Sequence, residues 1–163
     1  MAAMDKEAGL LGLKALITAT DIDPLSDLNA VYVQPLDYAA VSLPYHFCLL
    51  SYAEGQGNPY IKTTLGNGFQ HSWVARAFFG LGTGDIGYPS PLFGQMQAAA
   101  RGYALGLLEL LHNDTTKWGG TITAVGNAQF YMRDNFTYWE WDGQTMLGLL
   151  CEIPVTQMVY ITS

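Results

Sequence analysis

Charged residues are scarce in this sequence of 163 residues, where they make up 13% of the total. An ordinary soluble domain carries about 25%. Half of the residues are hydrophobic and 13% are aromatic. Much of the surface must therefore be uncharged, as it is where proteins meet one another. We expect a protein that assembles with itself; the alternative is a monomer with a polar, Gly- and Thr-rich surface.

Basic residues are especially few. The sequence has seven Lys and Arg and fourteen Asp and Glu, which gives a net charge of −7. The seven are scattered along the chain and form no stripe. Phosphate binding depends on Lys and Arg that neutralise the nucleic-acid backbone. The composition therefore argues against specific nucleic-acid binding. An acidic surface nevertheless suits a protein past which DNA slides without sticking.

Long apolar runs are also missing, because no segment reaches the roughly 18 consecutive apolar residues of a membrane span. Residues 1–16 carry Asp5, Lys6 and Glu7 before their apolar part, which does not fit a secretion signal. We expect no membrane association. The two cysteines, Cys48 and Cys151, each lie in an apolar run and are expected to be buried free thiols.

No segment carries a convincing nucleotide or metal site. Residues 82–87 have the glycine spacing of a dinucleotide-binding loop, but Tyr88 and Pro89 follow where the motif needs a helix to open. Three aspartates crowd residues 21–27 without the Gly and Glu that a calcium loop requires. The three histidines, His46, His71 and His112, are widely separated. We expect no cofactor and no metal.

Catalytic pairs are equally weak. His46 and Cys48 share a strand face, but no third group is at hand to orient such a nucleophile pair. Glu140 and Asp142 flank Trp141, which is the one pattern that resembles the carboxylate pair of a glycan hydrolase. The two abut a turn, so an aromatic contact surface is the better interpretation. We predict that the protein is not an enzyme.

Periodicity predicts two helices. The first covers residues 7–18, with Leu10, Leu13 and Ile17 on neighbouring turns. The second begins at Ser90–Pro91, a favoured N-cap and first helical residue, and runs to Leu111. Its apolar residues at helical spacing are expected to form one core stripe: Ala100, Tyr103, Ala104, Leu107, Leu108 and Leu111.

Most of the remaining chain is predicted to form β-strands. Alternation and β-branched residues predict them over 30–34, 46–52, 72–81, 121–125, 128–132, 136–141 and 146–159. Asp142–Gly143 is the strongest hairpin signal. Residues 53–72 are expected to form a long loop or hairpin arm. Because no βαβ alternation occurs, we predict one α+β domain over 1–163, with a mainly antiparallel sheet and two helices packed on one face.

Aromatic residues in the two hairpin regions are the best candidates for contact with a partner protein. Trp and Tyr offer large, rigid contact area and dominate the energy of many interfaces. The arm carries Tyr60 and Phe69, and the later hairpin carries Trp139 and Trp141. We predict these four as protein-interface residues.

The C-terminal half carries a family resemblance. A helix over 95–111 is followed by Lys117-Trp118-Gly119-Gly120-Thr121-Ile122, Gly126, the hairpin Trp141-Asp142-Gly143, Gly148 and a closing strand over 151–155. Together with the helix–strands–helix–strands order, this resembles the tail terminator family of long-tailed bacteriophages. Residues 53–70 and 80–87 have no counterpart in that pattern.

The resemblance implies a structural virion protein of the head–tail junction. Such a protein is made in the host cytoplasm and forms a homohexameric ring that caps the tail tube. Its partners are copies of itself, the tail tube protein and the head–tail connector protein, and DNA passes through the ring. Two other interpretations stay open: another phage structural component (head completion, minor tail or decoration protein) and a carbohydrate-binding domain that uses residues 138–142.

Overall fold

The computed structural model describes residues 6–34, 45–54, 60–62, 68–83, 91–131, 137–141 and 144–160. In chain order the elements are α1 (Lys6–Ala19), η1 (Leu25–Asp27), β1 (Ala30–Val33), β2 (Phe47–Glu54), β3 (Tyr60–Lys62), β4 (Gly68–Thr83), α2 (Pro91–Asn113), α3 (Lys117–Gly120), β5 (Ala124–Val125), β6 (Gln129–Tyr131), β7 (Thr137–Trp141) and β8 (Gln144–Tyr160).

The strands form one sheet of the order β1-β2-β4-β8-β5, with β3 also paired to β4, and β6 and β7 also paired to β8. Every pair is antiparallel except β1 with β2, which is parallel. The predicted α+β class with a mainly antiparallel sheet is confirmed. The parallel pair was not predicted, because strand direction depends on the path of the whole chain.

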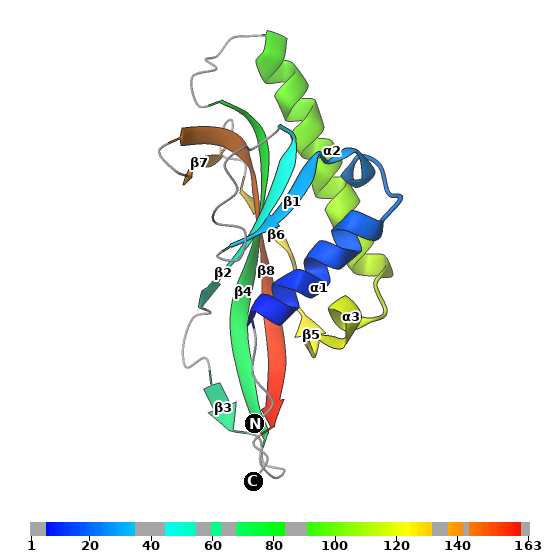
Figure 1. Ribbon diagram of the computed structural model, residues 1–163, viewed down its shortest axis with the longest axis vertical. Coiled ribbons are helices and arrows are strands. Elements are labelled where there is room, and N and C mark those ends of the chain that lie inside the picture. Colours follow the sequence, from blue (N-terminus) through cyan, green and yellow to red (C-terminus); the bar gives the residue numbers. More distant parts are fainter. Residues whose placement is uncertain are drawn as a thin grey trace.

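Two long strands, β4 and β8, form the spine of the sheet and run along the long axis of the molecule (Figure 1). They pair from Gly68 opposite Tyr160 to Thr83 opposite Met146, with one irregularity between Gly80 and Gly82. Both strands extend beyond the predicted bounds. All other strands attach to this pair directly or, for β1, through β2.

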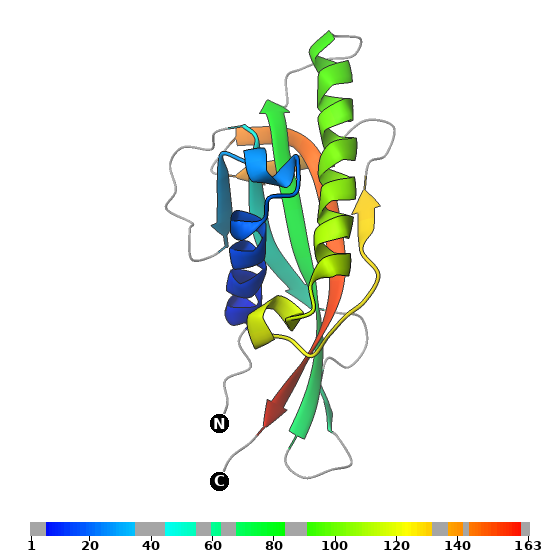
Figure 2. The same ribbon diagram turned by 90° about the vertical axis from the view of Figure 1, so that its right-hand side faces the viewer.

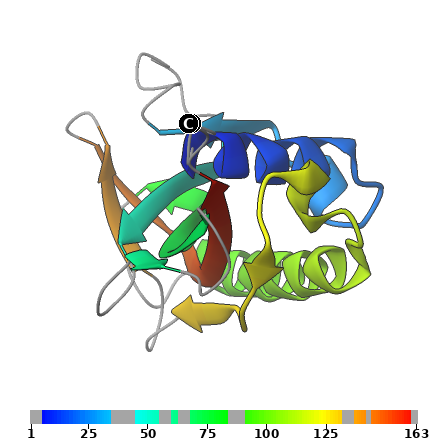
Figure 3. The same ribbon diagram turned by 90° about the horizontal axis from the view of Figure 1, so that it is seen from below.

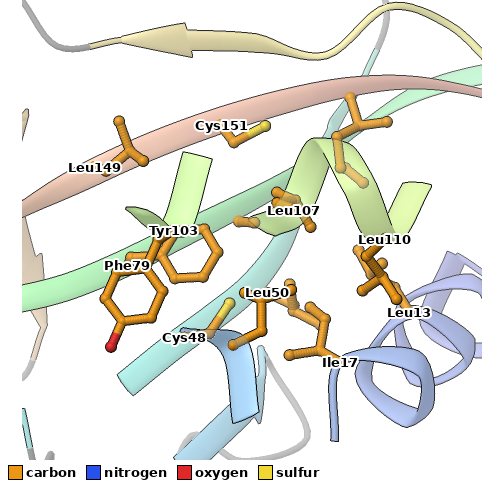
Figure 4. Close-up of a cluster of buried hydrophobic side chains, with 14 of the residues drawn as sticks. Leu13, Ile17, Cys48, Leu50, Phe79, Tyr103, Leu107, Leu110, Leu149 and Cys151 are labelled. Carbon is orange, nitrogen blue, oxygen red and sulfur yellow. The ribbon is translucent and has the colours of Figure 1, made fainter. Parts of the chain in front are cut away.

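Helices α1 and α2 lie on the same face of the sheet, as predicted (Figures 2 and 3). Alternate residues of β4 face them, so Trp73, Ala75, Ala77 and Phe79 are buried. The small alanines leave room for side chains from the helices. Figure 4 shows Leu13 and Ile17 of α1 and Leu107 and Leu110 of α2 converging on Phe79, Cys48 and Cys151.

The opposite face of the sheet is also buried at its centre. A second, smaller cluster joins Phe47, Leu49, Phe78 and Met146, none of which is exposed. Strand β2 therefore contributes alternate residues to two different clusters. This explains why residues 47–50 are an unbroken apolar run, which is typical of a strand buried on both faces.

The predicted arm is a hairpin. Strand β3 pairs with β4 in the register Tyr60–His71, Ile61–Gln70 and Lys62–Phe69. The segment between β3 and β4, residues 63–67, lies outside the described residues. The same holds for the predicted turn at Asp142–Gly143, although β7 and β8 pair on either side of it.

A short left-handed turn follows α2. Lys117 and Trp118 both have φ of 54°, which costs free energy for residues with a side chain. Gly119 and Gly120 continue at positive φ, where glycine is favoured. The Trp118 side chain is fully buried, and its backbone carbonyl lies close to Gly12 of α1. Burial of this large indole offsets the backbone cost of the turn.

Candidate protein interfaces

The arm places Tyr60 and Phe69 at one end of the long β4–β8 pair. Tyr60 lies opposite His71, and Phe69 lies between Lys62 and Val159. Strand β3 and the start of β4 therefore put Tyr60 and Phe69 at the end of the pair drawn lowest in Figure 1.

The second hairpin places Trp139 and Trp141 at the other end. Trp139 lies opposite Met146, and Trp141 lies opposite Gln144. Strand β7 therefore puts Trp139 and Trp141 at the end of the pair drawn highest in Figure 1.

The four predicted interface residues thus form two separate pairs. Trp139 is opposite Met146 and Phe69 is opposite Val159, thirteen positions further along β8. At about 3.3 Å per residue this separation is roughly 40 Å along the strand. No single partner surface of ordinary size contacts both pairs at once.

The outer face of α2 is a further candidate surface, which the sequence did not indicate. Leu105 is 68% exposed and Leu108 is 43% exposed. The prediction that Leu108 belongs to the core stripe was wrong; Ala100, Tyr103 and Leu107 are buried as expected. We call this surface the α2 outer face and define it by its exposed residues at alternating spacings of three and four: Ala98, Arg101, Leu105, Leu108 and His112.

A groove of about 410 Å³ adjoins the α2 outer face. Leu108 and His112 line it from α2, and residues 125–128 line it from β5 and the segment that follows. Asp114 and Lys117 contribute charged groups to its lining. Leu108 therefore borders a depression that a partner side chain can enter.

A polar cleft of about 430 Å³ lies between η1, the start of β2 and α2. In it the His46 Nδ1 atom and the Tyr103 hydroxyl are 2.8 Å apart. Burial lowers the pKa of His46. Burial, with the nearby charge of Asp27 and the Cys48 thiol, raises the pKa of Tyr103 to about 12. At neutral pH the pair is an uncharged hydrogen bond that joins β2 to α2.

The two cysteines are buried free thiols, as predicted. Burial, and then the neighbouring Cys151, raise the pKa of Cys48 far above its usual range. Burial, with the charge of Glu152, raises the pKa of Cys151 to about 12. Neither thiol forms the reactive thiolate at neutral pH. His46 points its Nδ1 atom at Tyr103, so the two residues do not act as a nucleophile pair here.

The other sites weighed from the sequence are a carboxylate pair at Glu140 and Asp142, a metal site and a membrane span. Glu140 lies opposite Thr145 in the β7–β8 pair, and Asp142 lies outside the described residues. Among the described residues there is no group of three or more His, Cys, Asp or Glu that could hold a metal ion. None of the helices in the described ranges is long and apolar enough to cross a membrane.

No model of a known protein family matches this sequence, and no curated protein matches it.

Proposed function

We propose that this chain is a structural virion protein without enzymatic activity, a ring-forming tail terminator of a long-tailed phage. In that role it caps the tail tube and joins it to the head–tail connector. The observation that carries the proposal is the arrangement of the aromatic hairpins. Tyr60 and Phe69 lie at one end of the β4–β8 pair, and Trp139 and Trp141 lie at the other end.

A subunit that joins two different partners needs two contact surfaces that do not interfere. The two hairpins meet this requirement, because roughly 40 Å of continuous strand separates them. Each end can contact a different protein, the tube protein at one and the connector protein at the other. The long antiparallel β4–β8 pair connects the two ends through backbone hydrogen bonds, which makes the link between them stiff.

Composition supports assembly with further copies of the chain. A ring uses head-to-tail contacts that close by rotation, so each subunit has two interfaces with its neighbours. Stable interfaces bury about 800 Å² on each partner. A surface with few charged side chains loses little hydration when it is covered in this way. The net charge of −7 suits a ring through which DNA passes.

The test is to remove the aromatic residues at one end at a time. The Tyr60→Ala/Phe69→Ala and Trp139→Ala/Trp141→Ala variants are assayed for binding to the tube protein and the connector protein of the same phage. Tyr131→Ala is the matched control, because Tyr131 is 37% exposed and lies opposite Leu150, between the two ends. We expect each double variant to lose one partner and keep the other, and the control to keep both.

Loss of neither partner by either folded double variant contradicts the proposal, as does loss of both partners by each of them. Immunogold labelling of intact virions adds a positional test. Label at the head–tail junction supports a terminator, whereas label on the capsid or the tail tip indicates a different structural component. Glycan binding that Trp139→Ala/Trp141→Ala abolishes would replace the proposal with the carbohydrate-binding interpretation.

A further inference from the structure

The α2 outer face has the residue pattern of a helix that packs against another helix. Its exposed residues recur at intervals of three and four, as do the contact positions of paired helices. The two leucines stand at the centre of the pattern. Ala98 and Arg101 precede them, and His112 follows them.

Charged residues flank the leucines with opposite signs. Arg101 lies one turn before Leu105, and exposed Glu109 lies one turn after it. In the part of the chain that the structure describes, neither Arg101 nor Glu109 forms an ion pair. The helix therefore presents a positive group, an apolar centre and a negative group in order along one exposed surface.

We propose that α2 packs antiparallel against α2 of a second copy of this chain, around a two-fold axis at Leu105 and Leu108. The order of the charges selects this arrangement. An antiparallel pair brings Arg101 of each copy to within about one turn of Glu109 of the other, at both ends of the contact. A parallel pair would oppose Arg101 to Arg101 and Glu109 to Glu109, and like charges in such positions are unfavourable.

Side-chain size fits the same arrangement. With the axis between the two leucines, His112 of one copy lies opposite Arg101 of the other, and the small Ala98 lies about one turn from that His112. Gly94 extends the small end, because a Cβ added there would meet no atom within 4 Å. Close approach of the two helices is thus possible at both ends. The groove of about 410 Å³ beside Leu108 can take the leucine side chains of the second copy.

The contact is weak by itself. A helix of 23 residues is about 34 Å long, and one exposed face of it covers less than the roughly 800 Å² of a stable interface. The contact is also isologous, since the same surface is used by both copies. It is therefore distinct from the head-to-tail contacts of a ring. The α2–α2 contact goes beyond the proposed function. It can form between two free subunits or between two rings.

Site-specific cross-linking tests the geometry. Leu105→Cys introduces an accessible thiol, while the native Cys48 and Cys151 are fully buried and stay unreactive with a short bismaleimide. Leu11→Cys is the matched control, because Leu11 is a leucine of α1 with 45% exposure. We expect covalent dimers from Leu105→Cys, at a rate that rises with protein concentration. Cross-linking of Leu105→Cys no faster than that of Leu11→Cys would overturn the proposal.

Charge reversal tests the direction of packing in the Leu105→Cys background. Arg101→Glu and Glu109→Arg should each slow cross-linking about tenfold, because each converts two attractive contacts into repulsive ones. The double exchange should restore the rate, since it restores opposite charges at both ends. Failure of the double exchange to restore it would overturn the antiparallel contact. Rings seen by electron microscopy report separately on the proposed function.

Discussion

The indole nitrogen of Trp73 donates a hydrogen bond of 2.9 Å to the side-chain oxygen of Gln157, and both side chains are buried. The amide nitrogen of Gln157 in turn donates to the carbonyl oxygen of Thr121 at 2.7 Å. The Gln157 amide thus joins β4 and β8 to the segment after α3. Because buried polar groups are costly when unpaired, this small network selects one position for that segment.

Replacing Gln157 by Leu should lower the free energy of unfolding by about 2 kcal/mol. The change leaves the Trp73 indole N–H and the Thr121 carbonyl without their partner in a buried site. Urea unfolding followed by tryptophan fluorescence measures the loss. Gln95→Leu, on an exposed position of α2, serves as the control and should change stability by less than about 0.5 kcal/mol. Equal stabilities for the two variants would contradict this role of Gln157.

Gly148→Ala should destabilise the protein by about 3 kcal/mol. A Cβ at this position would lie 1.9 Å from the Phe79 carbonyl oxygen, so β4 and β8 would have to separate. Gly94→Ala is the matched control, since a Cβ there meets nothing within 4 Å and alanine favours helix, and it should stabilise by about 0.5 kcal/mol. Thermal unfolding of both variants checks the prediction. A Gly148→Ala variant as stable as the parent protein would show that the close approach is absent.

Both thiols should be unreactive in the folded protein. Cys48 and Cys151 are fully buried, and burial raises the pKa of each thiol, to about 12 for Cys151. Titration with Ellman's reagent at pH 8 should therefore detect almost no thiol in buffer and both thiols in concentrated urea. Rapid reaction of either cysteine without denaturant would contradict the burial of this part of the core.

Asp114 should make the protein more stable above pH 4 than below it. Partial burial acts to raise the pKa of its carboxyl, but hydrogen bonds from the Thr116 side chain and from the Trp118 and Thr116 amides, with the Lys117 charge, lower that pKa below its ordinary 3.8. A lowered pKa in the folded state means stability that is present above 3.8 and is lost as the pH falls through the lower value.

Asp114→Asn should therefore cost about 1 kcal/mol at pH 7 and less at pH 2.5, because the stabilisation by the charged carboxylate is lost as the pH falls below 3.8 through the lowered pKa. Urea unfolding at the two pH values gives the comparison. Asp21→Asn, at an exposed aspartate, should differ from the parent by less than about 0.5 kcal/mol at both. A cost for Asp114→Asn that does not change with pH would exclude the charge as its cause.

Much of the fold could be predicted because local patterns and tertiary packing agree. Helix α1 buries Leu10, Leu13 and Ile17, the residues that share its predicted apolar face. Pro154, which has no backbone N–H, lies within β8 opposite Val74 of β4. Its carbonyl accepts from the Gly126 amide, so the side of Pro154 that lacks an N–H faces the short strand β5 and not β4. The long β4–β8 pair therefore loses no hydrogen bond there.

The exposed surfaces could not be predicted in the same way. Residues 104–111 contain five leucines, so periodicity alone does not reveal which leucine faces outward. Tertiary packing determines which leucines face outward. Pro24 and Leu25 pack against the side of α2 that carries Gly102 and Gly106. Leu105 and Leu108 are left uncovered. The opposite placement of the two aromatic hairpins likewise depends on strand register, which composition does not specify.

The solution mass of the purified protein, measured by light scattering after size exclusion with negative-stain images of the same peak, tests assembly most directly. A six-fold ring, either alone or on addition of tail tube protein, is the predicted result, with a mass that is six times 17.8 kDa or a multiple of that. A monomer of 17.8 kDa that never assembles, alone or with the tube protein, would contradict the account.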